Sequence, residues 1–198
     1  EAREFVITGV IAKNFMYDGV RISDSVDFEV SGNKCTDNDG NGIFVYSSTT
    51  RNGAINNNIC LRNDNQGILI QDVADCSIVG NTCNDNYNGI QSLGDNLSIT
   101  GNAYNKNTHN GIGGIMKKSL INSNTCNENG ASGVVVAGSS PATRSEQNDV
   151  IGNTCSENGA HGIHLSGYSL ENSVQNNKCY DNTQYGIAIA SFSSGNLV

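Results

Sequence analysis

The sequence predicts an all-β protein, a right-handed parallel β-helix (solenoid) of about eight coils, each 22–29 residues long. Three repeats that run in phase lead to this prediction. The first is Gly followed by Ile or Val, beginning at Gly19, Gly42, Gly67, Gly89, Gly111, Gly133, Gly162 and Gly186. The second is a pair of Asn columns: Asn33, Asn58, Asn81, Asn102, Asn124, Asn153 and Asn177, then Asn38, Asn63, Asn86, Asn107, Asn129, Asn158 and Asn182. The third is a column of Cys35, Cys60, Cys83, Cys126, Cys155 and Cys179, with Tyr104 and Ala12 in equivalent positions.

The elements within each repeat have the period of strands. An aliphatic column precedes the first Asn column by three residues, at Val30, Ile55, Ile78, Ile99, Ile121, Val150 and Val174. Polar residues flank each aliphatic position, which is typical of a strand, and Asn, Gly and Ser separate the strands. A repeat this short cannot bury its own apolar face, but stacked repeats can bury it together. Six-residue and nine-residue β-helix motifs do not fit this spacing.

The organisation expected is one β-helix domain over residues 1–198 with uncapped ends, forming part of a longer protein. Residues 1–8 already have the pattern of a coil strand, and the last four residues begin another coil. Repeat folds need caps at their ends to stay soluble.

The repeated columns have structural interpretations. The Cys column predicts buried free thiols, because no two cysteines have the close spacing of a zinc site. Cys76 lies off this column and is expected to be more exposed. Asn38 and its equivalents are expected at a turn, in the left-handed conformation or in a ladder of stacked amides. The Gly column predicts a corner where a Cβ would clash or φ is positive.

The residue after each Gly is expected to point inward, and the next one outward. Phe44, Leu69 and Val135, with Tyr46 and Leu93 nearby, then form an apolar outer stripe. Such a stripe favours either a contact with another chain, including a homo-oligomer, or a platform on which sugar rings stack. Both alternatives stay open at this point.

Composition excludes two classes of partner. The formal net charge is −8 with only 11 Lys and Arg, so neither nucleic acid nor an anionic membrane is an expected partner.

The stretch DNDGNG, residues 37–42, resembles the start of an EF-hand loop, but its twelfth position is Ser48 rather than Glu and its flanks are not helical. We therefore predict no metal site there, and leave open a Ca²⁺ bound in an acidic groove formed by several coils.

The N-terminal region is similar to a known family. AREFVITGVIAKNFMYDGVRISDSVDFEVSGN, followed by a coil ending DGNGIFV, resembles the catalytic module of the mannuronan (alginate) C5-epimerases. The resemblance implies a β-helix that acts on an acidic polysaccharide. The sequence departs from the family pattern in three places. The Asp-Pro-His motif is absent, Ser23 stands where a catalytic acid is expected, with Asp24 beside it, and Gly40-Asn41 replaces an Arg-His pair.

Epimerisation needs a base, a proton donor and a group that neutralises the uronate carboxylate. The resemblance makes Tyr17, Asp18 and Asp24 the candidate catalytic residues. Arg21 is the candidate carboxylate-binding residue, and Phe44 and Tyr46 are candidates for contact with the sugar. His161 and His164 lie close together in a later coil, and a catalytic role for them is a weaker alternative. Each of these residues also has a simpler interpretation as part of a solvated surface.

The function predicted is a polysaccharide-acting β-helix similar to alginate C5-epimerases and uronan lyases, without their full catalytic set. The alternative is a non-catalytic glycan-binding or structural rod, such as a phage tail spike or a surface adhesin. The sequence leaves open whether the chain is an enzyme. The expected location is extracellular, or on a virion or cell surface. The expected partner is an acidic polysaccharide or another glycan.

Overall fold

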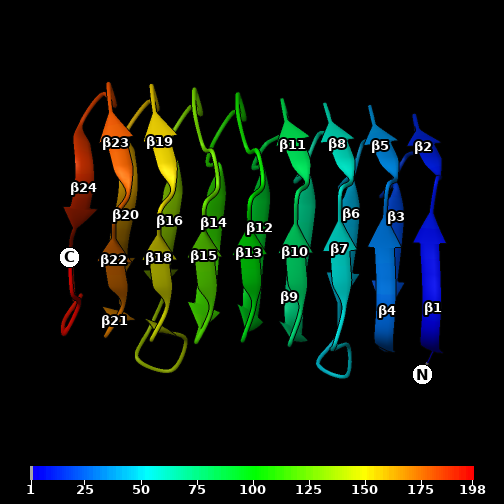
Figure 1. Cartoon of the computed structure of the whole chain (residues 1–198), viewed down its shortest axis with the longest axis horizontal. Helices are drawn as coiled ribbons and strands as arrows, with labels where there is room; N and C mark the ends of the chain where they lie inside the picture. Colours follow the sequence, from blue (N-terminus) through cyan, green and yellow to red (C-terminus); the bar gives the residue numbers. More distant parts are fainter. Residues whose placement is uncertain (1) are drawn as a thin grey trace.

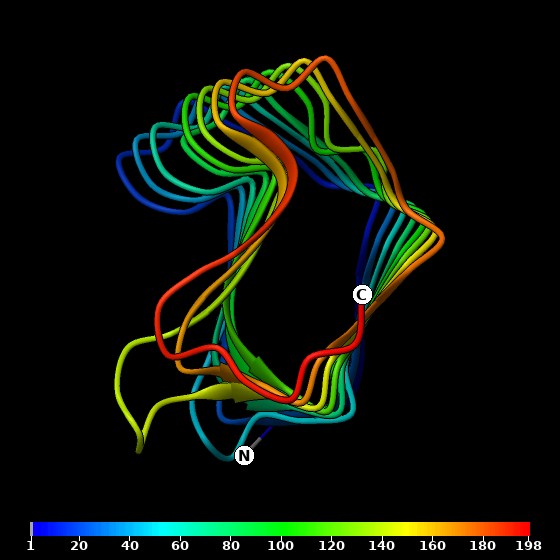
Figure 2. The same cartoon turned by 90° about the vertical axis from the view of Figure 1, so that its left-hand side faces the viewer.

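The predicted parallel β-helix is confirmed. The computed structural model describes residues 2–198, in which every regular element is a strand and every named strand pairing is parallel. The coils stack side by side along the long axis, with the two ends of the chain at opposite ends of the rod (Figure 1). Seen along the axis, they superimpose as one ring from which several loops protrude (Figure 2). No helix in the described part is long and apolar enough to cross a membrane.

The largest sheet has ten strands and carries the site described below. Its main path runs through eight of them: β3 (Val20–Ser23), β6 (Ile43–Tyr46), β9 (Ile68–Ala74), β12 (Ile90–Asp95), β14 (Ile112–Lys117), β16 (Val134–Gly138), β20 (His161–Gly167) and β24 (Tyr185–Ile189). Two short strands lie off this path, β17 (Ser145–Glu146) and β21 (Ser169–Leu170).

Two further faces close the coil. The eight-stranded sheet contains β1 (Ala2–Thr8), β4 (Ser25–Ser31), β7 (Ala54–Asn56), β10 (Ser77–Val79), β13 (Ser98–Thr100), β15 (Leu120–Asn122), β18 (Asp149–Ile151) and β22 (Ser173–Gln175). The third face contains β2 (Ile11–Lys13), β5 (Lys34–Thr36), β8 (Ile59–Leu61) and β11 (Thr82–Asn84), then β19 (Thr154–Ser156) and β23 (Lys178–Tyr180). Single bridges through Ala103 and Thr125 connect these two groups of strands.

The core consists of columns of like residues, one from each coil. The residues after the first seven repeat glycines are buried, as predicted, with Ile43, Ile68, Ile90 and Ile112 fully buried, whereas Ile187 in the last coil is 38% exposed. The register pairs each of them with its equivalent in the next coil. The aliphatic column of the eight-stranded sheet is buried in the same way.

Both Asn columns form hydrogen-bonded ladders. The side-chain amide of Asn38 donates to the Oδ1 of Asn63 at 2.8 Å and to the carbonyl of Ala12, and the pattern continues coil by coil to Asn182. The ladder alternative is therefore confirmed for the second column. The first column forms a ladder as well, from Asn33 to Asn177.

The left-handed conformation was assigned to the wrong residue. It belongs to the residue before each ladder Asn, at Asp37, Arg62, Asp85, Lys106, Glu128, Glu157 and Asp181, with φ between 56° and 59° at six positions and 52° at Arg62. The side chain of the Asn must point inward to reach its neighbours. The sharp turn therefore falls on the preceding residue.

The first seven repeat glycines are required by space and not by backbone conformation, whereas a Cβ on Gly186 in the last coil would have its nearest neighbour at 3.4 Å. None of them has a positive φ. A Cβ on Gly42 would lie 2.6 Å from the carbonyl oxygen of Gly67 and 2.8 Å from the Cβ of Cys60. The prediction that a Cβ would clash is therefore confirmed.

The predicted free thiols are buried in one column, and only Cys179 is half-buried. Cys76 contradicts its prediction, because it is 3% exposed. It lies at the third corner of the coil, where its equivalents in the next two coils are Leu97 and Ser119, both buried. The sequence showed no regular column at this corner, so the burial of Cys76 could not be recognised.

Candidate functional site

The outer face of the ten-stranded sheet has no repeated residue type. The row that follows the buried column is Arg21, Phe44, Leu69, Gln91, Gly113, Val135, His164 and Ala188. A second row runs through Ser23, Tyr46, Gln71, Leu93 and Ile115. As predicted, Phe44, Leu69 and Val135 face outward and are half-buried. The predicted contact of this stripe with a second copy of the chain stays a prediction.

Arg21, Phe44 and Tyr46 form one cluster at the N-terminal end of this face. The guanidinium carbon of Arg21 lies 5.2 Å from the centre of the Phe44 ring and 4.8 Å from that of Tyr46. The two rings stack with centroids 4.8 Å apart. Hydrogen bonds from Ser23 and Arg21 hold the pKa of Tyr46 below its ordinary value. The rings thus orient the guanidinium, and its N–H groups can bind a carboxylate.

Asp18 joins the cluster in a structural role. Its Oδ2 lies 3.8 Å from a guanidinium nitrogen of Arg21. Its Oδ1 accepts hydrogen bonds from the backbone N–H and the side-chain amide of Asn41, at 2.9 and 2.8 Å. Asn41 in turn accepts from the backbone of Gln66. Asp18 therefore starts a short ladder, and the buried Asn41, which stands where the resemblance expects part of an Arg-His pair, has a structural role.

The other two catalytic candidates, Asp24 and Tyr17, have different surroundings. Asp24 accepts hydrogen bonds from the hydroxyls of Ser47 and Thr49, and these bonds hold its pKa below the ordinary value. A carboxylate with a lowered pKa is a weak base near neutral pH. The side chain of Tyr17 is 74% exposed in the loop that precedes Asp18. The structure thus gives direct contacts among four of the six predicted site residues, whereas Asp24 acts on Tyr46 through its charge and Tyr17 is exposed.

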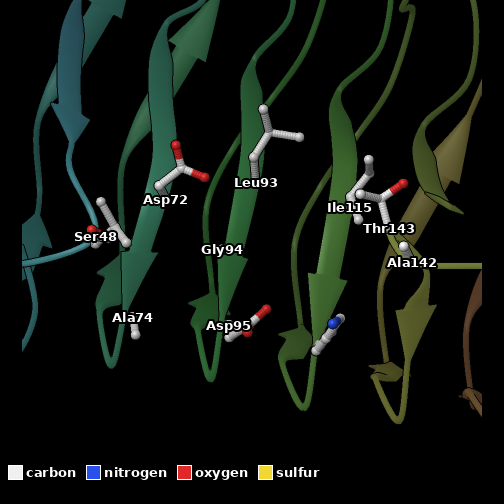
Figure 3. Close-up of a pocket in the computed structure, with 11 residues that line it drawn as sticks. Ser48, Asp72, Ala74, Leu93, Gly94, Asp95, Ile115, Ala142 and Thr143 are labelled. Carbon is white, nitrogen blue, oxygen red and sulfur yellow. The ribbon is translucent and has the colours of Figure 1, made fainter. Parts of the chain in front are cut away.

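A hollow of about 480 Å³ lies further along the same face. Its floor contains Leu93 and Ile115, which project from the neighbouring strands β12 and β14 (Figure 3). Ser48 bounds it on one side, and Ala142 and Thr143 bound it on the other. These bounding residues belong to two loops that protrude at the same end of the strands (Figure 1).

Charged groups line the end of the hollow. Asp72 and Asp95 come from β9 and β12, and Lys117 comes from β14. Asp95 and Lys117 are register partners on adjacent strands. Sequence reasoning missed this site, because its residues come from five coils and share no motif. One signal was present: the repeat step of 29 residues between Gly133 and Gly162 contains the inserted loop, and insertions in such folds often border the binding face.

Histidine and tyrosine rings follow on the same face. Tyr87 stacks on His109 with centroids 5.3 Å apart, beside a smaller hollow of about 250 Å³. In later coils His161 contacts His164 edge-on at 4.6 Å and stacks on Tyr185 at 5.5 Å. Burial, followed by the charge of His161, lowers the pKa of His164. Tyr87 and His109 border the strands β12 and β14 that also carry the larger hollow, whereas His161, His164 and Tyr185 belong to coils after the loop that bounds it.

Residues 1–114 match the profile of a family described as "Periplasmic copper-binding protein (NosD)", which covers more than half of the chain. The chain belongs to the NosD family. No curated protein matches the sequence.

The residues of this NosD-family chain do not fit a copper site. No group of three or more His, Cys, Asp or Glu side chains in residues 2–198 is placed to hold a metal ion. A hydrogen bond from the neighbouring thiol, together with burial, raises the pKa of Cys35 and Cys179 well above the ordinary value. Copper binds the thiolate form of cysteine, which such a site disfavours.

Solved structures with the same fold include sugar-modifying and phage proteins. The A-module of the mannuronan C-5 epimerase AlgE4 of Azotobacter vinelandii is 17% identical over 100% of this chain, with a TM-score of 0.86. The periplasmic alginate epimerase AlgG is 15% identical, with a TM-score of 0.70, and the match covers 91% of this chain and 51% of AlgG. The Dettilon tailspike protein is 14% identical over 88% of this chain and 43% of its own, with a TM-score of 0.69.

These likenesses confirm the resemblance of the NosD-family chain to epimerase β-helices at the level of fold. Identities this low do not carry over an activity. The chain spans 58% of the length of the AlgE4 A-module, so an activity of the whole module is not transferred either.

Proposed function

We propose that the chain binds an extended polysaccharide along the outer face of the ten-stranded sheet. The hollow between the two protruding loops carries this proposal, because residues of the adjacent strands β9, β12 and β14 line it together. A ligand lying in it would run along the axis of the rod.

The coil spacing suits a sugar polymer. Adjacent strands lie about 4.8 Å apart, which is close to the length of one pyranose unit in an extended chain. The loop after β6 and the loop after β16 are four coils apart, which corresponds to about 19 Å. Successive sugars could therefore contact equivalent positions of successive coils.

The side chains have the required chemistry. Leu93 and Ile115 offer apolar surface to the C–H face of a sugar ring. Asp72, Asp95, Ser48 and Thr143 offer hydrogen-bonding groups to its hydroxyls. Towards the N-terminal end, Gln71 and Tyr46 continue the row from Leu93 to the Arg21 cluster. Arg21 there is the group we propose to bind a carboxylate, with Phe44 and Tyr46 as its support.

Binding is favoured over turnover within this chain. Asp18 already interacts with Asn41 and Arg21, Asp24 accepts hydrogen bonds from two hydroxyls, and Tyr17 is exposed. Catalysis by Tyr17, Asp18 and Asp24 in a longer protein stays a proposal, and C5 proton exchange on polymannuronate would test it. The names of the family and of AlgG include the word periplasmic, which supports a location outside the cytoplasm.

The test is affinity electrophoresis of the chain in gels containing one polysaccharide each, from a panel of polyuronates and neutral glycans. Leu93→Glu should weaken binding at least about tenfold, because it places a charge in the floor of the hollow. The matched control is Leu120→Glu, since Leu120 is a half-buried, outward leucine of the eight-stranded sheet. We expect the control to bind like the unchanged chain. Absence of binding to every polysaccharide, or equal binding by both variants, would overturn the proposal.

A further inference from the structure

The charged side chains that line the hollow indicate which class of polysaccharide it binds. The hollow contains two carboxylates, Asp72 and Asp95, and one cation, Lys117. Lys117 is a register partner of Asp95 on one side and of Glu146 on the other. On both neighbouring strands, the register position beside this lysine therefore holds an acidic residue.

The neighbouring cations are also accompanied by acids. Arg144, beside the hollow, pairs with Glu146 at 2.5 Å. Arg21, outside the hollow, lies 3.8 Å from Asp18. The whole chain has a formal net charge of −8. The hollow and its surroundings therefore offer no excess of positive charge to a polyanion.

A polyuronate would meet repulsion in this hollow. It carries one carboxylate per sugar, and the coil spacing would bring its carboxylates past Asp72 and Asp95. Like charges at close range disfavour binding and act as a specificity filter. A neutral sugar has no such conflict, because its hydroxyls donate hydrogen bonds to carboxylates and the charge on the acceptor strengthens those bonds.

We infer that the hollow between Ser48 and Thr143 binds a neutral, hydroxyl-rich segment of polysaccharide. Asp72 and Asp95 accept hydrogen bonds from sugar hydroxyls, and Leu93 and Ile115 contact the ring. This inference rests on the proposed function and narrows the ligand of the hollow alone, because Arg21, the proposed carboxylate-binding residue, lies outside the hollow. The acidic polysaccharide expected from the sequence is the competing ligand in the test.

The test compares hexasaccharides of mannan, glucan and galactan with a hexasaccharide of polymannuronate, by isothermal titration calorimetry at two salt concentrations. We expect at least one neutral hexasaccharide to bind about tenfold or more tightly than the uronate. The double variant Asp72→Asn/Asp95→Asn should weaken neutral binding and strengthen uronate binding, which narrows this ratio. Added salt should reduce the ratio in the unchanged chain, because it screens the repulsion.

A matched control removes the same number of charges elsewhere. Asp64→Asn/Asp149→Asn changes two exposed aspartates outside the hollow and should leave the ratio unchanged. Tighter binding of the uronate, lost in Leu93→Glu, would overturn this inference and leave the proposed function standing. An equal shift of the ratio in both double variants would also overturn it, because the effect would then come from net charge. No binding of any hexasaccharide or polymer would overturn both.

Discussion

The corners of the coil and the outer face of the ten-stranded sheet follow opposite rules. At two corners the same Asn recurs in seven successive coils, and each is bonded to the next. On the outer face, eight successive coils carry eight different residue types in one row, from Arg21 to Ala188. Yet both sets of residues belong to the same stacked coils.

The difference follows from what each side chain contacts. A ladder Asn is buried and bonds both to the coil before it and to the coil after it, so a change there affects three coils. An outward residue contacts solvent on one side, so it can change without affecting its neighbours. Residue types that recur in every coil therefore indicate positions that stabilise the fold, and a face without recurring residue types indicates the surface available for binding.

The sharpest test of this comparison is a substitution inside a ladder. Asn107→Leu should lower the free energy of unfolding by about 3 kcal/mol or more, because each buried polar group left without a partner costs about 1–3 kcal/mol. The groups affected include the carbonyl of Cys83 and the backbone N–H of Asn86. Urea unfolding followed by circular dichroism measures the change.

The control for this variant is the same change at an exposed site. Asn65 lies in a loop and its side chain is exposed, so Asn65→Leu should change the stability by no more than about 0.5 kcal/mol. Equal losses of unfolding free energy in the two variants would show that a ladder Asn stabilises the protein no more than an exposed Asn does.

The second test uses two glycines of one coil. A Cβ on Gly111 would lie 2.7 Å from the carbonyl oxygen of Gly133, whereas a Cβ on Gly113 finds its nearest neighbour at 3.5 Å. Neither has a positive φ. Gly111→Ala should therefore destabilise the protein by about 2 kcal/mol, since backbone must move to admit the methyl group. Gly113→Ala, on the outer face, should stay within about 0.5 kcal/mol of the unchanged chain.

Thermal and urea unfolding of both alanine variants check this pair. A large loss in Gly113→Ala would mean that the outer face is as constrained as the corners. The comparison between the two regions would then fail.

The fold could be predicted from the sequence because each structural position recurs in several coils. The Gly, Asn and Cys columns each occur six or more times, so their period identifies the coil and their residue types identify inward positions. Predictions failed where a single residue carried the information. Cys76 occupies a corner filled by Leu97 in one neighbouring coil, and Ser119 follows one coil later, so no column revealed its burial.

The candidate site was predictable only in part. Asp18, Arg21, Phe44 and Tyr46 lie together because they come from two adjacent coils whose register the repeat fixes, and their roles in binding or catalysis stay predictions. The hollow was missed, because its shape depends on two inserted loops that approach one face from distant coils. The structural roles of Asp18 and Asn41 were missed because a short ladder of mixed residue types has no visible period.

The smallest effect is expected at the one place where the Cys column is interrupted. Tyr104 occupies a cysteine position and is fully buried, and its hydroxyl has no hydrogen-bond partner among the described residues. Burial raises the pKa of this hydroxyl well above its ordinary value. Tyr104→Phe should therefore raise the free energy of unfolding by about 1 kcal/mol, because it removes a buried polar group and keeps the ring.

Tyr87→Phe is the control for this substitution, because Tyr87 lies on the outside and is 47% exposed. Its hydroxyl faces water in both the folded and the unfolded chain, so the change should leave stability within about 0.5 kcal/mol. A loss of stability in Tyr104→Phe would show that the hydroxyl is satisfied inside the coil. A buried column could then hold a polar residue that differs from the others in it. A recurring residue type would no longer be enough to distinguish core positions from binding positions.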